Sequence, residues 1–419
     1  MYLGDQAKMT DHDSVPMPHD TPAPYLRRDF LRKSMLLALP LAGVALPAAV
    51  VHASKLTGGN MQPELISTDA YSPPARARGS TRVNVRNHGA RGNGTADDTT
   101  AFQKAVNALP SDGGTVYVPA GTYRIDAVRS VKLRSRMHLQ MDPSAKLVAK
   151  PTGAAQYNVV LADNIHDVAI SGGQIIGERD QHAGTSGEGG HGIRIRGSQR
   201  VTIRDIRISK CWGDGITVGP KPVWQAPYIP SRDVALAGVV CTGNRRNALS
   251  IGNVIGMKVY DSEFSNTHGT KPQCGIDVEP DNDDYGSNDS CDNVHIQNCL
   301  MIGNAKNGLN LWSQRAQGIT VKNCVMDNNG VCGVFAEGAR NVVLTGNTIS
   351  HNQSNGMALR KNSSNYQVYG NTSFQNYAKQ GPNPRSPFDL VGVARKVEKD
   401  IIVSNDGSSG MSIGKNHYR

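Results

Sequence analysis

Two acidic side chains, Asp277 and Glu279, stand two positions apart in the sequence CGIDVEP, residues 274–280. In a β-strand, side chains i and i+2 point to the same face and lie roughly 7 Å apart, because each residue adds about 3.3 Å. Two carboxyl groups at about that distance can serve as general acid and general base around a water molecule, the geometry of inverting glycoside hydrolysis. Crowding of like charges also raises one pKa of such a pair, as a general acid requires. The spacing therefore predicts a catalytic pair at Asp277 and Glu279.

The strand that carries this pair belongs to a series of similar segments. Their first residues are 23 to 33 positions apart, and each segment places apolar residues two positions apart: HGIRI, DGITV, NALSI, CGIDV, NGLNL, CGVFA and NGMAL, between His191 and Leu359. A second alternating segment follows each of the first six. Short strands in such units leave no room for a crossover helix, so the pattern predicts an all-β, single-stranded parallel β-helix. We expect the paired apolar residues to fill its bore.

Coiling aligns equivalent residues of successive segments into columns on the outer face. The column of Asp277 is Arg194, Thr217, Ser250, Asp277, Asn310, Phe335 and Ala358, and that of Glu279 is Arg196, Gly219, Gly252, Glu279, Trp312, Glu337 and Arg360. An aromatic ring beside acidic, basic and amide groups suits a sugar. We therefore expect a sugar-binding floor with these members: Trp312, Asn310, Glu337, Arg194 and Arg360.

Asparagines form columns of their own at the turns. One contains Asn244, Asn304, Asn329, Asn352 and Asn376, and another contains Asn247, Asn307 and Asn355. Identical turns stacked roughly 4.8 Å apart allow each Asn to bond the next, which predicts asparagine ladders. Asp214 and His191 occupy the second column, so two interpretations are open for them. They are either ladder residues or an acid and a base, and we keep Asp214 as a catalytic and His191 as a substrate-binding candidate.

Elimination from a uronate is an alternative to hydrolysis. It needs a positive group for the uronate carboxylate, which the guanidinium of Arg246, or of its neighbour Arg245, could provide. A calcium ion held with the help of Asp281 and Asp283 could also provide it, whereas hydrolysis needs no cofactor. A solvated acidic face on a non-catalytic glycan-binding protein is the third interpretation.

The amino terminus resembles an export signal. The sequence YLRRDFLRKS (25–34) precedes an apolar stretch (35–51) that two prolines and a glycine interrupt. This resembles a twin-arginine signal peptide cleaved after about Ala53 and favours it over a membrane anchor. We expect a signal peptide over 1–53, a linker over 54–80, and a periplasmic or secreted protein without stable membrane insertion.

The formal net charge of the 419-residue chain is +10. Scattered positive charge on an exported protein is compatible with an acidic polysaccharide as partner. The sequence has no lysine-rich run interleaved with aromatics, which argues against nucleic acid. Seven cysteines lie in the repeat, and Cys274 and Cys291 either form a disulfide around the insertion 275–290 or are separate thiols. Nothing in the pattern indicates an oligomeric state.

The segment before the repeat predicts a short capping helix with Asp98 as its N-cap. Here GARGNGTADDTTAFQKAV (89–106) is followed by GGTVYVPAGTY (113–123). These strings resemble the amino-terminal part of the pectate-lyase-like, rhamnogalacturonase and epimerase-like β-helix superfamily, and with the repeat the resemblance covers about 80–380. It implies a right-handed parallel β-helix and, commonly, an enzyme that cuts or epimerises polysaccharide.

The resemblance does not fix the reaction, because the superfamily contains lyases, hydrolases, epimerases and phage tailspikes. Polygalacturonase-type hydrolases carry Asn-Thr-Asp, a paired Asp-Asp and Gly-His-Gly. This chain has GDG (213–215) after GHG (190–192) and lacks Asn-Thr-Asp, so those roles are not transferred. We expect a β-helix over 81–385 that cleaves an acidic polysaccharide, with hydrolysis ahead of elimination, and a cap or tail over 386–419.

Overall fold

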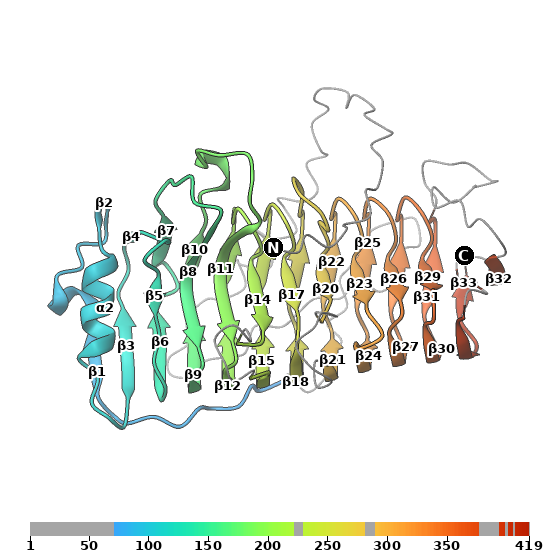
Figure 1. Cartoon of the computed structure of the whole chain (residues 1–419), viewed down its shortest axis with the longest axis horizontal. Coiled ribbons are helices and arrows are strands. Elements are labelled where there is room, and N and C mark those ends of the chain that lie inside the picture. The colour runs from blue at the N-terminus through green and yellow to red at the C-terminus, as the bar shows by residue number, and fades with distance from the viewer. Residues whose placement is uncertain are drawn as a thin grey trace, which may run out of the picture. The chain divides into compact units, whose positions relative to one another are not determined.

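The computed structural model describes residues 71–221, 229–280, 290–376, 394–398, 401–404 and 407–418. Their strands form three sheets in which each strand pairs with the equivalent strands one coil before and after it (Figure 1). All these pairings are parallel except that of β32 with β33. The predicted parallel β-helix is confirmed.

We call the sheets A, B and C. Sheet A contains β1 (Arg82–Asn84), β3 (Gly114–Val118), β6 (Met137–Met141), β9 (His166–Ser171), β12 (Gln199–Arg204), β15 (Ser231–Ala237), β18 (Val254–Tyr260), β21 (Asp292–Gln297), β24 (Gln317–Lys322), β27 (Arg340–Thr345), β30 (Ser364–Tyr369) and β34 (Ser409–Ile413). Sheet B contains β2 (Asn93–Asp97), β4 (Thr122–Ile125), β7 (Lys146–Ala149), β10 (Gln174–Ile176), β13 (Arg207–Ser209), β16 (Val240–Thr242), β19 (Glu263–Ser265), β22 (Leu300–Ile302), β25 (Val325–Asp327), β28 (Thr348–Ser350), β31 (Thr372–Phe374) and β35 (His417–Tyr418). Sheet C contains β5 (Val131–Lys132), β8 (Gln156–Asp163), β11 (Gly189–Arg196), β14 (Ile216–Gly219), β17 (Leu249–Ile251), β20 (Ile276–Val278), β23 (Leu309–Trp312), β26 (Val334–Glu337), β29 (Met357–Arg360), β33 (Ile401–Ser404) and β32 (Ala394–Glu398). Sheet C thus carries all seven repeated segments.

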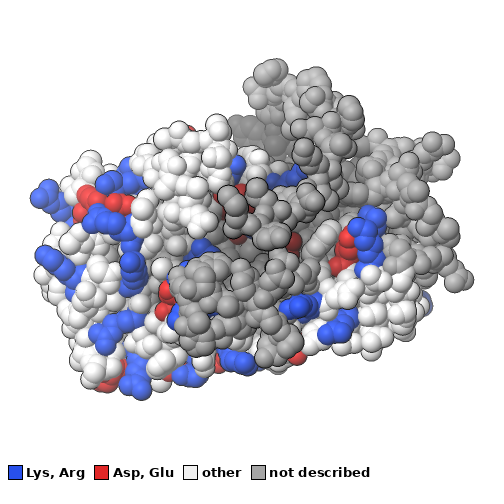
Figure 2. Space-filling model, viewed as in Figure 1, with Lys and Arg blue, Asp and Glu red and all other residues white. Residues whose placement is uncertain are grey.

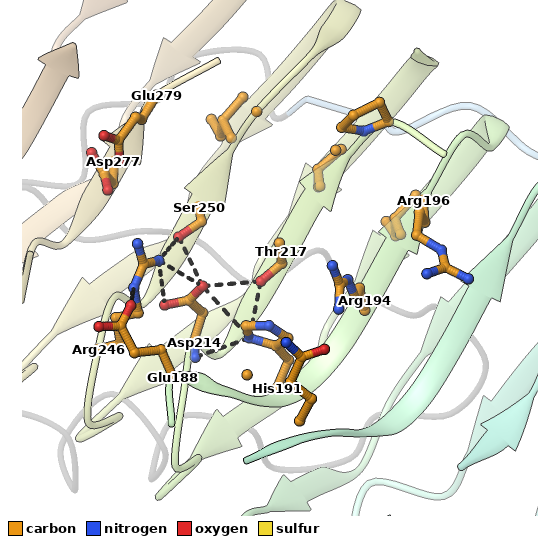
Figure 3. Close-up of a pocket in the computed structure, with 18 of the residues that line it drawn as sticks. Glu188, His191, Arg194, Arg196, Asp214, Thr217, Arg246, Ser250, Asp277 and Glu279 are labelled. Atoms are coloured by element: carbon orange, nitrogen blue, oxygen red, sulfur yellow. Dashed lines mark hydrogen bonds and ion pairs between the residues drawn. The ribbon is translucent and has the colours of Figure 1, made fainter. Parts of the chain in front are cut away.

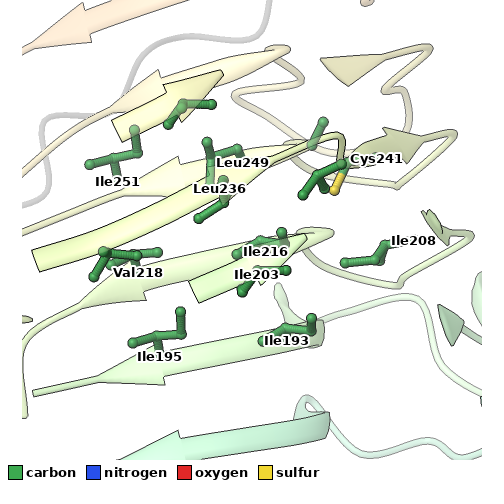
Figure 4. Packing of buried hydrophobic residues seen from close by; sticks show 14 of the residues in the cluster. Ile193, Ile195, Ile203, Ile208, Ile216, Val218, Leu236, Cys241, Leu249 and Ile251 are labelled. Atoms are coloured by element: carbon green, nitrogen blue, oxygen red, sulfur yellow. The ribbon is translucent and has the colours of Figure 1, made fainter. Parts of the chain in front are cut away.

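The bore is filled with apolar side chains, as the alternation predicts. Figure 4 shows inward side chains of successive coils in contact, among them Ile193, Ile216 and Leu249. Each of these three is fully buried. Burying such a side chain stabilises the fold by about 1.5–3 kcal/mol, so the stacked aliphatic rows supply a large share of the solenoid's stability.

The amino-terminal coil is capped by the helix α2 (Thr99–Asn107), preceded by the 3₁₀ helix η1 (Val85–His88). The predicted capping helix is confirmed, and its Phe102 and Val106 pack into the core. The cap differs from the prediction, because Asp98 stands at the N-cap position but its carboxylate accepts from the backbone N–H groups of Arg91 and Gly92. Asp97 instead accepts from the Thr99 N–H, at 3.0 Å.

Asparagine ladders hold the turns together. Asn304 donates from both its N–H and its Nδ2 to Oδ1 of Asn329, and Asn329 does the same to Asn352, over 2.9–3.1 Å. Asn376 continues the row, as predicted. A second ladder, Asn347 to Asn371 and Asn416, was not predicted. All seven cysteines are free and buried, so the disulfide alternative for Cys274 and Cys291 is wrong.

The ends of the expected domain are described only in part. Residues 1–53 lie outside the described residues, as do 54–70 of the linker. Residues 71–80 run along the outer face of sheet A, where the Tyr71 ring stacks on Tyr260 with centroids 4.2 Å apart. In the expected tail, 386–419, strands β33, β34 and β35 add one strand to each sheet. None of the helices in the described part of the chain is long and apolar enough to cross a membrane.

Candidate functional site

A cavity of about 360 Å³ opens on the outer face of sheet C. Its floor consists of β11, β14, β17 and β20, and residues 155–156 and 187–189 form part of its wall. Figure 3 shows the polar side chains of these strands turned to the same side. The cavity thus gathers residues from four successive coils, far apart in the sequence.

The strand register confirms the column of Asp277. Arg194 pairs with Thr217, Thr217 with Ser250, Ser250 with Asp277, and Asp277 with Asn310. The pairs keep one register from β11 through β23. In the neighbouring column, a Cβ added at Gly219 would meet no atom within 4 Å. Glycines 219 and 252 therefore leave the floor open between Arg196 and Glu279.

Asp277 points outward as predicted, but it is covered. Only 1% of its surface is exposed, and its two oxygens accept from Nδ2 of Asn247 at 2.9 Å and of Asn310 at 2.7 Å. Burial raises the pKa of Asp277, and the charge of Asp214 adds to this effect, against the opposing influence of the Asn310 bond and of the Arg246 charge. Asp277 thus keeps a proton more readily than an ordinary aspartate.

Glu279 is the exposed member of the predicted pair. It follows Asp277 by two residues, lines the same cavity, and lies on the same side in Figure 3. The strand rise separates the two residues by roughly 7 Å. The pair therefore combines a covered carboxyl group with a carboxylate open to solvent.

Asp214 is a buried anion held by many donors. It accepts from the backbone N–H of Asn247 at 2.9 Å, the Ser250 hydroxyl at 3.0 Å, the Thr217 hydroxyl at 3.1 Å and Nη1 of Arg246 at 3.2 Å. Burial alone would raise the pKa of Asp214, but the Arg246 charge, with His191 and these bonds, outweighs it and lowers the pKa. Asp214 therefore acts both as a ladder residue and as the counter-ion of Arg246.

His191 lies against Asp214 as a neutral ring. Its Nδ1 accepts from the backbone N–H of Asp214 at 3.2 Å. Burial lowers the pKa of His191 to about 4, despite the opposing effect of Asp214. Because Nδ1 accepts a hydrogen bond, we infer that the neutral ring carries its proton on Nε2. His191 is then a hydrogen-bond donor at the cavity rather than a base.

Arg246 joins this buried anion to the cavity wall. Its Nη1 contacts Asp214, while its Nε donates to Oε2 of Glu188 at 3.1 Å. Arg194 and Arg196 also line the cavity, and Arg196 donates to Asp163 at 2.9 Å. The cavity lining therefore contains three guanidinium groups, of which Arg194 and Arg196 lie on the side away from Asp277 and Glu279 (Figure 3).

The adjacent Arg245 does not share this role. Its guanidinium stacks 3.7 Å from the centre of the Trp212 ring and donates to the Gly187 carbonyl at 2.9 Å. His182 also stacks on the Trp212 ring, with the two ring centroids 3.8 Å apart. Arg245 thus fixes the loop before β11 and does not belong to the cavity lining.

Four predicted binding residues do not line the cavity: Asn310, which covers Asp277, and Trp312, Glu337 and Arg360. The pairing of Val278 with Leu311 places Trp312 one coil after Glu279, on the same outer face, where it is 37% exposed and stacks on Phe335. Glu337 accepts from Lys361 at 2.5 Å, and the guanidinium of Arg360 lies 5.7 Å from the Phe335 ring. Trp312, Glu337 and Arg360 form a separate group next to the cavity.

The calcium ligands named from the sequence, Asp281 and Asp283, lie outside the described residues. Among the residues that the structure describes, no three His, Cys, Asp or Glu side chains lie close enough together to hold a metal ion. The calcium interpretation stays a prediction.

Sequence reasoning missed Glu188, and it named Asn310 as a sugar-binding residue and Asn247 as a ladder residue without foreseeing that both amides cover Asp277. Glu188 belongs to a polar loop before the first segment, GERDQHAGTSGEGG (177–190), whose position beside the strands was the only signal. The repeat already places Asn310 beside Asp277 in the same column, so this amide donor could have been found from the sequence.

Comparison with known proteins agrees with this fold. A curated relative, the uncharacterized protein YclG of Bacillus subtilis (strain 168), is 30% identical over 272 residues, 59% of this chain and 46% of that protein. The iota-carrageenase of Alteromonas macleodii is 30% identical over 128 residues, 30% of this chain and 23% of that protein. The chain thus spans less than half the length of these relatives.

Among solved structures, the A-module of mannuronan C-5 epimerase AlgE6 of Azotobacter vinelandii superimposes with a TM-score of 0.61 at 20% identity, over 71% of this chain and 77% of that one. A model described as rhamnogalacturonase A/epimerase, pectate lyase-like, matches residues 82–178. The model of the right-handed β-helix region matches 191–373 and 237–413, together more than half of the chain. The chain therefore belongs to the right-handed β-helix family.

Proposed function

We propose that this chain hydrolyses glycosidic bonds of an acidic polysaccharide in the sheet C cavity, with Asp277 as general acid and Glu279 as general base. The observation that carries the proposal is the contrast between the two carboxyl groups. Burial raises the pKa of Asp277, whereas Glu279, one residue after the end of β20, is exposed. Environments that separate two carboxyl groups in this way are how glycosidases assign acid and base roles.

The bonds around Asp277 are compatible with donation of a proton. Each carboxyl oxygen has two lone-pair directions, so an oxygen that accepts from Asn247 or Asn310 can still carry the proton. The two amides also fix the rotamer of the acid, which favours a constant geometry toward the leaving oxygen. Glu279, two residues on, lines the same cavity and is assigned the activation of the water.

An acidic substrate is supported by the charges of the cavity. Arg194, Arg196 and Arg246 line it, and guanidinium groups bind carboxylates and sulfates well. The relatives point the same way, since iota-carrageenase and mannuronan C-5 epimerase are named for polysaccharides. We further propose that the protein is exported through the twin-arginine pathway and that its hydrolysis needs no metal.

The test is the Asp277→Asn variant, with Glu279→Gln beside it, assayed for new reducing ends on a panel of uronate-containing and sulfated polysaccharides. Loss of the acid or the base should lower the rate by about 100-fold or more, since general acid–base groups contribute about 10²–10⁴-fold. Asp205→Asn, an exposed aspartate paired with Arg204, is the matched control and should keep the full rate. Unchanged turnover in Asp277→Asn would reject the assignment.

Elimination is the second candidate, because Arg246 stands ready to neutralise a uronate carboxylate. A product with an unsaturated end that absorbs ultraviolet light would establish elimination, and a saturated reducing end establishes hydrolysis. Loss of activity in a chelator would contradict the metal-independent mechanism. Binding of polysaccharide with no product of either kind would identify a non-catalytic glycan-binding protein.

A further inference from the structure

Arg246 has one side fixed in the protein and one side turned to the cavity. Its Nη1 is held by Asp214 at 3.2 Å and by the Ser250 hydroxyl at 3.3 Å. Because Asp214 is itself only 1% exposed and accepts from the backbone N–H of Asn247, it holds Nη1 of Arg246 in a fixed position. The guanidinium plane is therefore oriented before any ligand arrives.

The other edge of Arg246 meets a very different carboxylate. Nε donates to one oxygen of Glu188, whose side chain is 61% exposed on the loop that leads into β11. Figure 3 shows Glu188 beside Arg246 at the cavity, on the side opposite Ser250. Nη2 of Arg246 has no hydrogen-bond partner among the described residues. A planar carboxylate fits the edge formed by Nε and Nη2 with two parallel bonds.

We propose that Glu188 occupies, in the empty cavity, the position on Arg246 that the carboxylate of a uronosyl residue takes when substrate binds. Glu188 is thus a self-ligand that substrate must displace, and it sets the affinity and the charge preference of this subsite. The inference rests on the proposed function only in taking an acidic polysaccharide as the ligand. It makes no use of the bond-breaking step.

The energetics favour exchange. An exposed, singly bonded ion pair contributes little, because solvent screens it and the long side chain loses rotamer freedom. A uronate held by two parallel bonds to a pre-oriented guanidinium gains more per contact. The Glu188 bond is therefore weak enough to break, yet it keeps Arg246 paired while the cavity is empty.

The experiment measures binding of a uronate oligosaccharide by titration calorimetry, with the full chain and its Glu188→Gln variant. Glutamine keeps the shape of the side chain and removes its charge. We expect Kd for the oligouronate to fall by about two- to fivefold, the range for release of one exposed ion pair. Kd for the same oligosaccharide with its carboxyl groups reduced to alcohols should not change.

Glu263→Gln is the matched control, because Glu263 lies on β19 in sheet B and bonds Ser265 at 2.5 Å, outside the cavity lining. It should leave both Kd values unchanged. Weaker or equal binding of the oligouronate to Glu188→Gln would overturn the inference, as would absence of oligouronate binding to either protein. A sulfated oligosaccharide is titrated as well. If it alone bound more tightly to Glu188→Gln, the group that Glu188 replaces would be a sulfate and not a carboxylate, which would also contradict the inference. Tighter binding by Glu188→Gln together with no turnover would reject the proposed hydrolysis and leave this inference standing.

Discussion

The buried histidine of the site makes the stability of the protein depend on pH. Burial lowers the pKa of His191 from 6.5 to about 4, so between these values the unfolded chain binds more protons than the folded chain. Stability is then fully present above about pH 6.5 and is lost as the pH falls through about 4. At about 1.4 kcal/mol per pKa unit, the loss amounts to at most about 3.5 kcal/mol.

Replacing His191 by Asn should remove this dependence. Asn suits the position, because Asn247 and Asn307 occupy the same column and bond the next coil. We expect the urea midpoint of the wild type to fall more steeply between pH 7 and pH 4.5 than that of His191→Asn. Comparison at pH 7.5, where the ring is neutral in both states, provides the reference. Equal slopes in the two proteins would contradict the burial argument.

The residues of the site differ in how far the sequence predicts them. The column of Asp277 follows from counting, because a strand alternates with period two and the coils stack in register. The burial of Asp277 does not follow, since it depends on the rotamers of Asn247 and Asn310, which bend over it. Glu188 does not follow either, because the loop that carries it precedes the first repeated segment and is held by contacts with Arg245.

At the scale of elements, the asparagine ladder is as important to the coil as the aliphatic rows. Asn329 is fully buried, and its side chain accepts from Asn304 and donates to Asn352 and to the Met301 carbonyl. Truncation takes the acceptor away from the buried backbone N–H of Asn304, at a cost of about 1 kcal/mol or more, and also removes the side-chain bonds to Asn352 and to the Met301 carbonyl. The sequence predicts this element well, because one residue type recurs at one turn.

Asn329→Ala should therefore lower the free energy of unfolding by about 2–4 kcal/mol. Urea denaturation followed by circular dichroism measures it. Asn107→Ala, a change at the exposed last residue of α2, is the matched control and should cost less than about 0.5 kcal/mol. A loss below 1 kcal/mol at Asn329 would mean that neighbouring coils satisfy the freed groups in another way.

At the scale of the whole molecule, charge and connectivity have separate roles. Figure 2 shows lysine and arginine dispersed over the visible face rather than gathered in one patch, so the net charge of +10 favours a polyanion only in general. The arginines that line the cavity are the place where we expect a polyanion to bind.

The contacts between coils are unusual, because each coil of a solenoid normally contacts only its neighbours. Residues 71–80, which we call the strap, break this rule. Figure 1 shows the strap running from β1 along the outer face of sheet A toward β18. Arg76 is 7% exposed and donates to the Thr202 hydroxyl at 2.8 Å, the Val201 carbonyl at 3.2 Å and Asp233 at 2.6 Å. Its partners follow it by 125 to 157 residues. The strap therefore fastens the first coil to the middle of the stack.

Replacing Arg76 by Ala should release the strap without unfolding the solenoid. The change removes several charge-assisted bonds worth about 1.5 kcal/mol or more together, so the released fraction should rise by about tenfold or more. Trypsin cleavage after Arg78, an exposed residue of the strap, reports that fraction when reclosing is faster than cleavage. Arg204→Ala removes an exposed pair with Asp205 on the same sheet and should leave cleavage at Arg78 unchanged. Equal cleavage at Arg78 in Arg76→Ala and wild type would show that Tyr71 and the other strap contacts are enough to hold the strap on sheet A. If Arg204→Ala increased cleavage at Arg78 as much as Arg76→Ala does, the effect would come from the loss of surface charge.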